Sequence, residues 1–316
     1  MSAKTIAVIG ATGGQGGSVV NTFLDAGFAV RAITRNTASP KAVALKERGV
    51  EVVTADLNDL DSLTKAFDGV HIIFAVTDFF EPFIAGGPDH AMKIESAQGI
   101  NLAKAAAATS TLEHYIWSTL PNALEISGGK YLIPHFEGKN KVDKFIKSDE
   151  KLLKKTTFLW VTWFASNALF PPFKPTLHAT SGKYVLFQPA IAETPVLTIG
   201  DQTKNVGPYA LAIVQKPEFT LPGKFAIANS ESQTIGSLLD IWAKVTGKET
   251  EYVKVGLEQF DRFFPGWGRE MGIMMEYWEN YPGMQAWSGE DLVTARELGL
   301  EGQGRAEDAL RELELL

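Results

Sequence analysis

The 316-residue chain contains no cysteine, which excludes disulfide bonds, thiolate metal sites and cysteine nucleophiles. It also lacks an excess of basic residues: 30 lysines and arginines against 37 acidic residues give a net charge of -7, which disfavours a broad nucleic-acid-binding face. None of the five histidines have H-x-x-x-H spacing, so no metal site is predicted. No G-x-S-x-G motif surrounds Ser118, which disfavours a hydrolase.

No apolar run is long enough to cross a membrane. The longest, residues 158–173, is interrupted by Asn167 and Pro171 and is shorter than the roughly 20 residues that a bilayer requires. Residues 1–10 show no basic segment followed by an apolar one and a cleavage site. With 45% hydrophobic and 21% charged residues, these absences predict a soluble intracellular protein of the cytoplasm or nucleus, without a membrane or nucleic-acid partner.

The first half of the chain alternates between short apolar runs and segments with helical spacing. Strands are expected at 5–9, 28–34, 50–55, 70–76, 114–117 and 157–164, and helices at 15–26, 41–48, 59–67, 89–108 and 139–155, with a loop at 77–88. This alternation predicts an α/β fold with a Rossmann-type, doubly wound parallel sheet.

After Phe164 the alternation ends. Short strands are expected at 183–188, 195–199 and 224–228, and helices at 208–215 and from Ser230 or Ser232 to 245. The prediction is therefore a Rossmann domain at residues 1–165 and a smaller C-terminal α/β lobe at 166–316, with segments within 195–230 completing the sheet.

A glycine-rich loop lies between the first expected strand and helix. Gly10, Gly13 and Gly16 have G-x-x-G-x-x-G spacing, with Thr12 and Gln15 between them. Because glycine has no Cβ, a diphosphate can approach the backbone, and the N-terminus of the next helix attracts its charge. At the start of a β-α-β unit the pattern predicts a dinucleotide site, the alternative being a tight turn without a ligand.

The acidic residue that usually follows the second strand in NAD-binding folds is missing. The segment reads Ile33-Thr34-Arg35-Asn36, and the Arg35 guanidinium with the Thr34 hydroxyl suits a ribose 2′-phosphate. The predicted cofactor is therefore NADP(H) rather than NAD(H), unless Arg35 is only a solvated surface residue. Asp56, after the third strand, either accepts a hydrogen bond from the adenine amino group or caps a helix.

Further segments carry a pattern that belongs to a known family. Besides the glycine loop and Thr34-Arg35-Asn36, they are AVTDFFE at 75–81, HFEGK at 135–139, SGKY at 181–184, VTGK at 245–248 and FPG at 264–266. On these motifs the chain resembles the NmrA-like family of atypical short-chain dehydrogenase/reductases, and most of all its HSCARG-like, NADP-sensing branch. The resemblance implies a Rossmann domain that holds NADP(H) and a smaller lobe that closes a cleft.

The resemblance also implies roles for single residues. Its cofactor contacts are the glycine loop with Thr12 and Gln15 at the diphosphate and ribose, Arg35 at the 2′-phosphate, Ala75, Val76 and Thr77 on the path to the nicotinamide, Lys139 at the nicotinamide ribose, and Asn167. Ala165 and Ser166 replace the Phe-Glu pair that usually precedes this asparagine, so the wall near the nicotinamide is altered.

The tyrosine of the Tyr-x-x-x-Lys motif of short-chain reductases is absent. Lys139 fills the lysine position, but His135 stands four residues before it, and Ser118 occupies the place of the reductases' serine. Residues i and i+4 share a helix face, and an unperturbed imidazole titrates near ~6.5. His135 is therefore either a general acid or a structural residue packed against the cofactor, and Tyr131 is a more distant candidate donor.

Aromatic residues gather after the fourth and sixth expected strands, where ligands bind in such sheets. An apolar pocket there suits a flat hydrophobic molecule, although the same rings can form the core of the lobe. The candidate substrate-pocket residues are Phe79, Phe80, Phe83, His135, Phe164 and Phe170.

Two functions from different classes follow. One is an NADPH-dependent reductase of a small hydrophobic C=O or C=N compound. The other is a catalytically silent NADP(H)-sensing regulator that acts through a protein partner. The oligomeric state stays open.

Overall fold

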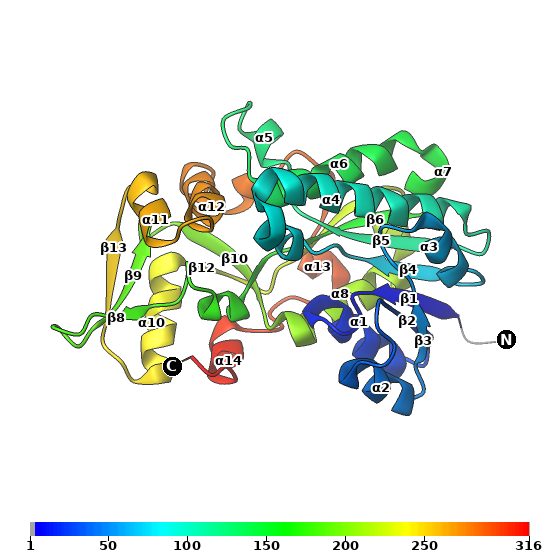
Figure 1. The fold of residues 1–316 in the computed structure, drawn as a ribbon, viewed down its shortest axis with the longest axis horizontal. Coiled ribbons are helices and arrows are strands. Elements are labelled where there is room, and N and C mark those ends of the chain that lie inside the picture. Colours follow the sequence, from blue (N-terminus) through cyan, green and yellow to red (C-terminus); the bar gives the residue numbers. More distant parts are fainter. Residues whose placement is uncertain (1–3, 316) are drawn as a thin grey trace.

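In the computed structural model, which describes residues 4–315, an eight-stranded parallel sheet lies in the right-hand half of the molecule as drawn in Figure 1, with the C-terminal lobe on the left. Its strand order, β14-β11-β6-β5-β4-β1-β2-β3, contains the 3-2-1-4-5-6 order of the Rossmann fold and confirms the doubly wound α/β prediction. All residues of β4, β5 and β6 are buried, as expected for apolar strands covered on both faces. The strands are β1 (Thr5–Ile9), β2 (Ala29–Thr34), β3 (Glu51–Thr54), β4 (Ile72–Ala75), β5 (His114–Thr119), β6 (Thr156–Val161), β11 (Phe225–Ala228) and β14 (Leu292–Val293).

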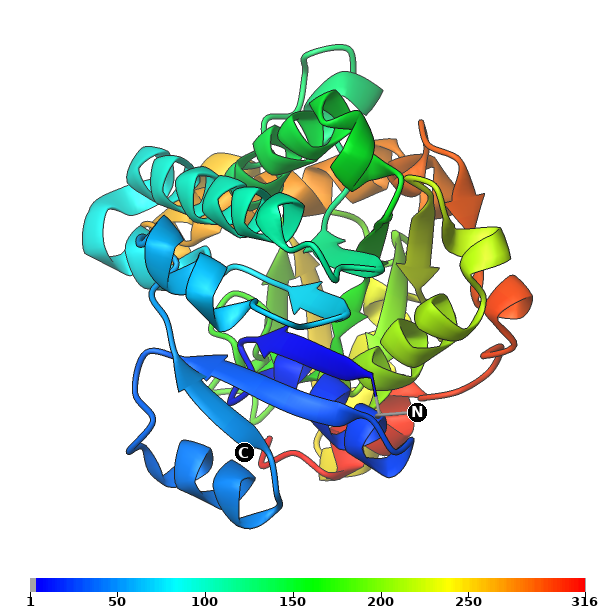
Figure 2. The same ribbon diagram turned by 90° about the vertical axis from the view of Figure 1, so that its right-hand side faces the viewer.

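Helices cover both faces of this sheet (Figures 1 and 2). On one face α4 (Phe80–Ala108) packs along α6 (Pro134–Ser148), and on the other α1 (Gly14–Asp25) packs along α8 (Gln202–Gln215). Within residues 4–315 no helix is long and apolar enough to cross a membrane. Shorter helices beside the sheet are α2 (Pro40–Glu47), α3 (Leu60–Ala66), α5 (Ala123–Ile126), α7 (Glu150–Leu153) and α9 (Pro217–Thr220).

The predicted loop at 77–88 is wrong, because α4 already begins at Phe80. The Asp78 side chain accepts a hydrogen bond from the Phe80 N–H at 2.8 Å and starts the helix there. The break that the glycines and Pro88 indicated is confined to Gly87, whose φ of 79° kinks the helix. Phe80 and the residues before the kink therefore sit on a short helical segment of their own.

Three other helices begin at residues that differ from the predicted ones. α6 begins at Pro134 rather than 139 and ends at Ser148, where Asp149 caps the separate α7. α8 begins at Gln202, six residues before the predicted start. Thr234, not Ser230 or Ser232, caps the next helix through a capping box with Ser237, because residues 231–234 form a strand.

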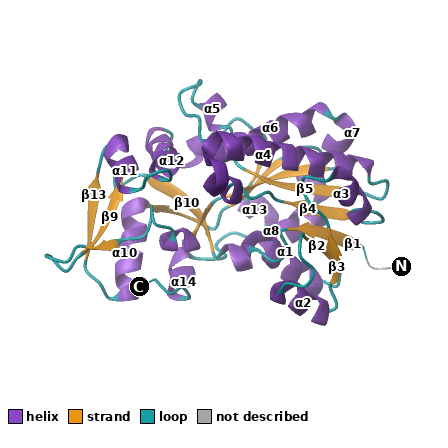
Figure 3. Cartoon of the chain, viewed as in Figure 1, coloured by secondary structure: helices purple, strands orange, loops and turns teal. Residues whose placement is uncertain are grey.

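The C-terminal part contains two smaller three-stranded sheets, β12-β10-β7 and β13-β9-β8, among helices (Figure 3). Of the predicted 195–230 range, β11 joins the large sheet, but β10 belongs to a small one, and the edge strand β14 comes from much later in the chain. The strands are β7 (Trp163–Phe164), β8 (Thr176–Leu177), β9 (Tyr184–Gln188), β10 (Pro195–Gly200), β12 (Glu231–Thr234) and β13 (Thr250–Lys254). The helices are α10 (Ile235–Thr246), α11 (Leu257–Phe263), α12 (Gly268–Asn280), α13 (Ala295–Leu298) and α14 (Ala306–Arg311), with 3-10 turns η1 (Ala165–Leu169) and η2 (Gly283–Trp287).

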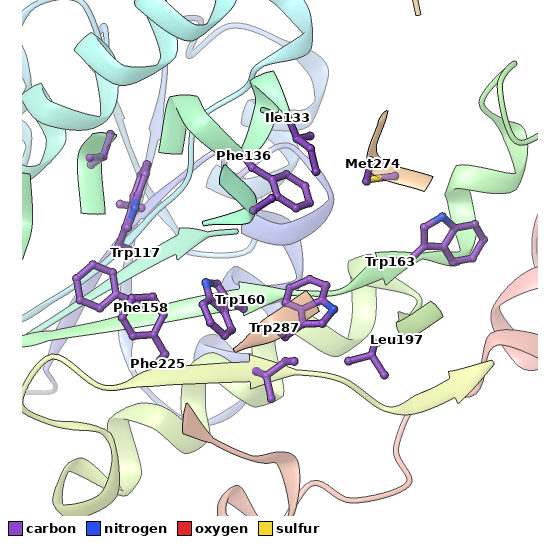
Figure 4. Close-up of a cluster of buried hydrophobic side chains, with 14 of the residues drawn as sticks. Trp117, Ile133, Phe136, Phe158, Trp160, Trp163, Leu197, Phe225, Met274 and Trp287 are labelled. Carbon is purple, nitrogen blue, oxygen red and sulfur yellow. The ribbon is translucent and has the colours of Figure 1, made fainter. Parts of the chain in front are cut away.

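A continuous hydrophobic core joins the sheet to the C-terminal elements (Figure 4). Phe158 on β6 stacks on Phe225 of β11 with ring centroids 4.4 Å apart. Trp160 lies 4.9 Å from Phe225 and 6.0 Å from Trp287 of η2. The lobe is therefore packed onto the sheet through large buried rings.

Candidate functional site

A cleft of about 1270 Å³ runs along the carboxyl ends of the large sheet's strands. It crosses the point between β1 and β4 where the strand order reverses, the usual ligand position in open α/β sheets. Trp267, Met271 and Trp278 of the C-terminal part form its other wall. The predicted residues that line it are Gly10, Thr12, Gly13, Gln15, Gly16, Thr34, Arg35, Asp56, Val76, Thr77, Phe79, Phe80, Ser118, His135, Lys139, Phe164, Asn167 and Phe170.

Ala75 and Phe83 are the two predicted site residues outside the lining of the cleft. Ala75 is fully buried at the end of β4, because the chain enters the cleft only at Val76. Phe83 is buried behind the wall, with ring centroids 5.7 Å from Phe79 and 4.7 Å from Trp267. The predicted ligand contact of these two residues stays a prediction, and in this structure both lie behind residues that line the cleft.

The glycine loop forms an open cradle at the start of α1. Gly10 has a φ of 68°, and its carbonyl accepts a hydrogen bond from Gly13 N at 2.8 Å. A Cβ on Gly16 would lie 2.3 Å from that carbonyl oxygen, so only glycine fits there. Gly13 is the N-cap and provides no side chain, which leaves the first N–H groups of α1 without a side-chain cap. Such a helix N-terminus favours an anion.

The end of the cleft that the sequence motifs assign to the cofactor's adenosine, called the adenosine end below, carries an exposed ion pair between Arg35 and Glu81. The two guanidinium nitrogens of Arg35 donate to the two carboxylate oxygens of Glu81, each at 2.9 Å. This hydrogen bonding raises the pKa of Arg35 and lowers the pKa of Glu81. Lys41 lies nearby and donates to the Thr12 carbonyl at 3.2 Å. Glu81 thus occupies the fork of Arg35 that the prediction assigns to a 2′-phosphate.

Asp56 lies at the same end and does not cap a helix. Its Oδ1 accepts hydrogen bonds from the backbone N–H of Asn58 at 2.8 Å and from the Asn58 side chain at 2.9 Å. The N-cap of α3 is Asp59 instead. Of the two alternatives for Asp56, the structure removes helix capping and leaves the carboxylate on the cleft wall.

The opposite end of the cleft is built around Lys139, whose ammonium group is held by buried partners. Its Nζ lies 2.9 Å from Glu95 Oε1 and 2.9 Å from Thr77 Oγ1, and 3.3 Å from the Thr77 carbonyl. Thr77 Oγ1 in turn donates to Glu95 Oε1 at 2.8 Å. The Trp117 ring lies 5.5 Å from Nζ. Lys139 is thus fixed in position by a carboxylate, a hydroxyl and an aromatic ring.

Glu95 was missed by sequence reasoning, although a local signal exists. It falls on one stripe of α4 with Ala91 and Gly99, at i, i+4 and i+8, and all three are buried. An acid on a stripe of small residues indicates a buried partner rather than a solvated face.

His135 lies one helical turn before Lys139 on α6, and both line the cleft, as predicted from their spacing. Its Nδ1 forms a hydrogen bond with Glu270 Oε1, and its backbone N–H donates to the same oxygen at 3.1 Å. The ring lies 5.9 Å from Phe79 and 6.0 Å from Phe80, centroid to centroid. Glu270 is 135 residues away in sequence, so no local pattern could have indicated it.

The other two proposed proton carriers are placed differently. Ser118 is buried at the end of β5, and its Oγ donates to Gln15 Oε1 at 2.8 Å, which links β5 to the glycine loop. Tyr131 does not line the cleft and packs against Tyr277 and Tyr281, with centroids 5.8 and 6.3 Å away. His135 is therefore the better placed candidate donor.

A second buried carboxyl lies behind this end of the cleft. Asp143 accepts hydrogen bonds from Trp117 Nε1 at 2.7 Å and from Thr119 Oγ1 at 2.8 Å. Burial raises the pKa of Asp143 to about 7, and these two hydrogen bonds only partly oppose that shift. Asp143 fixes the ring on which the Lys139 ammonium lies.

The sheet order, the glycine cradle and the cleft at the switch point define a Rossmann-type α/β protein. The NmrA-like family model matches residues 2–296, and the chain belongs to this family.

Two curated relatives match most of the chain. An NmrA-like family domain-containing protein of Dictyostelium discoideum is 26% identical over 296 residues, which cover 92% of each chain. The NmrA-like family domain-containing oxidoreductase cpsB of Aspergillus campestris is 28% identical over 80% of this chain and 76% of its own length.

Among solved structures, the fold is similar to that of NmrA, described as a negative transcriptional regulator. The TM-score is 0.78 at 23% identity, covering 99% of this chain and 96% of that one. NmrA has also been solved in complex with NAD and with NADP.

Proposed function

We propose that the protein is an NADPH-dependent reductase of small hydrophobic compounds that contain a C=O or C=N bond. One observation carries the proposal: a single cleft joins the glycine loop to Lys139 and His135. A dinucleotide whose diphosphate lies on the loop would therefore extend toward these two side chains. The name oxidoreductase for the Aspergillus campestris relative and the NAD and NADP complexes of NmrA support the same class.

The residues of the cleft fit a nicotinamide dinucleotide. Because Gly16 has no Cβ, the start of α1 packs directly against the Gly10 carbonyl, and the first N–H groups of α1 have no side-chain cap. Arg35 would bind the 2′-phosphate in exchange for Glu81, which makes NADP(H) the proposed form. When bound, the reduced nicotinamide supplies the hydride, and the protein's part is to hold the reactants and provide a proton.

Lys139 is proposed to hold the ribose next to the nicotinamide. Its two shorter contacts, to Glu95 and to the Thr77 hydroxyl, fix the ammonium group. Its longest contact, 3.3 Å to the Thr77 carbonyl, is the one that a ribose hydroxyl can replace. Because the ammonium is nearly buried, it keeps its position whether or not a ligand is present.

The substrate end of the cleft is apolar. Phe80, Phe170 and Trp267 pack against one another with centroids 4.7–6.2 Å apart, and Met271 and Met274 line the wall beside them. His135 is the polar group among these rings. Such a pocket fits a flat hydrophobic acceptor whose one polar atom faces the imidazole.

Turnover with NADPH tests the proposal. The purified protein is titrated with NADPH and NADH by tryptophan fluorescence, and then quinones, ketones and cyclic imines are added while loss of the reduced cofactor's absorbance is followed. We expect acceptor-dependent oxidation of NADPH. His135→Gln is expected to lower kcat by roughly 10²–10⁴-fold with NADPH affinity unchanged, because a general acid contributes that much. If neither NADPH nor NADH binds, the proposal is overturned.

The second candidate is an NADP(H)-sensing regulator, and the exposed Arg35–Glu81 pair favours it. Exchange of Glu81 for a 2′-phosphate would release the short segment of α4 before the Gly87 kink. The absence of the reductase tyrosine and the description of NmrA as a negative transcriptional regulator point the same way. Tight NADPH binding without turnover, together with an NADPH-dependent change in oligomeric state or partner affinity, would replace the reductase proposal by this one.

A further inference from the structure

Glu270 directs one of its carboxylate oxygens entirely at His135. It lies in the first turn of α12, is 3% exposed, and its Oε1 accepts from both the ring Nδ1 and the backbone N–H of His135. Its Oε2 is buried without a hydrogen-bond partner within residues 4–315. Burying a carboxylate with a single polar neighbour costs free energy. The arrangement therefore indicates that Glu270 has a function at His135.

The backbone around Glu270 fixes the position of this carboxylate. A Cβ at Gly268 would lie 2.7 Å from the Asp261 Cα, so α12 begins in direct contact with α11. The backbone N–H of Arg269 donates to Asp261 Oδ1 at 2.9 Å. On the same helix Met271 and Met274 line the cleft, while Glu270 does not. Glu270 therefore stands behind the histidine, on a turn that packing holds in place.

The two ring nitrogens of His135 have different surroundings. Nδ1 is bound to Glu270, whereas Nε2 makes no hydrogen bond within the described part of the chain, and the ring lines the cleft. When Glu270 is ionised it only accepts hydrogen bonds, and Nδ1 is then the donor of this contact. The free nitrogen, Nε2, is then the one available to a ligand.

We propose that Glu270 is the positioning residue of His135, holding Nδ1–H so that Nε2 of the protonated ring is the proton donor to the substrate. This rests on the proposed reductase function. As hydride from NADPH adds to the carbon of the C=O or C=N bond, the π electrons go to the oxygen or nitrogen, which takes the Nε2 proton. The ring is left neutral, with Nδ1–H still bound to Glu270, and solvent returns the Nε2 proton.

A purely structural role makes a different prediction. Ile133 is the N-cap of α6 and its apolar side chain accepts no hydrogen bond, so Glu270 also caps this helix by accepting the His135 N–H. Loss of a cap lowers stability but does not determine which ring nitrogen is protonated. The protonation pattern of the ring therefore separates positioning from capping.

The test compares Glu270→Leu, which leaves no acceptor for Nδ1–H, with His135→Gln and the control Glu276→Leu, which makes the same chemical change on α12 away from the cleft. Nitrogen NMR of 15N-histidine-labelled protein reports the protonation of Nδ1 and Nε2, and His135→Gln identifies the signals of His135 among the five histidines. For E270L we expect loss of the wild-type Nδ1–H pattern, a fall in kcat of at least about tenfold, and NADPH affinity within about twofold. The E276L control should change none of these.

Two outcomes would overturn the inference. One is an unchanged His135 nitrogen pattern in E270L; the other is a changed pattern with kcat within about twofold of wild type. If the wild-type protein reduces no acceptor, the proposed reductase function fails by itself. The nitrogen pattern still decides whether Glu270 sets the protonation of His135.

Discussion

The two ends of the cleft use the same chemistry, a carboxylate facing a cationic or protonatable side chain, in opposite surroundings. At the adenosine end, the Arg35 and Glu81 side chains are 68% and 60% exposed. At the other end, Lys139 and Glu95 are 10% and 0% exposed. An exposed pair contributes little and can be exchanged for a ligand, whereas a buried pair is held because either charge alone is costly. The first end is therefore suited to exchange a partner, and the second to keep its geometry.

The largest expected effect comes from breaking the buried pair. Glu95→Ala leaves the Lys139 ammonium buried without its carboxylate, and should lower the free energy of unfolding by about 3–5 kcal/mol. Urea unfolding measures it. The control is Glu113→Ala, which breaks the exposed pair with Lys4 and should cost at most about 1 kcal/mol. Equal effects of the two variants would contradict the comparison.

The next effect concerns Asp143, a buried carboxyl whose hydrogen-bond partners among residues 4–315 are Trp117 and Thr119, neither of them a cation. Its pKa is raised to about 7, so between about pH 4 and pH 7 the unfolded chain loses this proton while the folded protein keeps it. Stability therefore falls as pH rises through this window, by up to about 4 kcal/mol. Asp143→Asn removes this pH-dependent contribution to stability. Unfolding measured at several pH values should show that wild type loses stability relative to D143N from pH 4 to 7, and that the difference stays constant above pH 7. A difference in stability that is the same at every pH would contradict this prediction.

A smaller effect is expected at the exposed pair. Arg35→Ala should weaken NADPH binding by about 1.5–3 kcal/mol, the usual contribution of hydrogen bonds to a charged group, and leave NADH binding unchanged. The ratio of the two dissociation constants, from fluorescence titration, is the measurement. Arg48→Ala, an exposed arginine bound to Asn21, serves as the control. An unchanged ratio in R35A would remove Arg35 from the 2′-phosphate site.

The smallest expected effect has the opposite sign. Glu81→Gln removes the carboxylate that competes for Arg35 and should strengthen NADPH binding by up to about 1 kcal/mol, again without a change for NADH. The same titration measures it. Weaker NADPH binding in E81Q would mean that Glu81 helps to position Arg35 rather than compete for it.

The features that the sequence predicted are those encoded locally. The doubly wound parallel sheet followed from the alternation of apolar runs and helical segments, and the glycine loop and Arg35 from their positions after the first two strands. The spacing of His135 and Lys139 was sufficient to place both on one wall of the cleft. Each of these predictions depends on residues only a few positions apart.

The partners Glu81 and Glu270 could not be predicted in the same way, because each acts on a residue far away in sequence. Glu81 meets Arg35 across 46 residues and Glu270 meets His135 across 135. The error at 77–88 has another cause. Gly86, Gly87 and Pro88 indicate a loop, whereas in the structure the positive φ of Gly87 alone interrupts the helix. The predicted range 139–155 starts five residues late, because Pro134 favours the first position of a helix and α6 begins there.

The large sheet has a consequence for how the protein can be altered. Two of its strands, β11 and β14, return from residues 225–228 and 292–293, and Trp287 packs against Trp160 beneath the cleft. A fragment cut after residue 165 would lack these strands and expose the aromatic rings that they cover. The C-terminal half therefore cannot be replaced as a separate unit. A change of ligand preference has to be made by single substitutions in the cleft wall, at positions such as Met271 and Trp278.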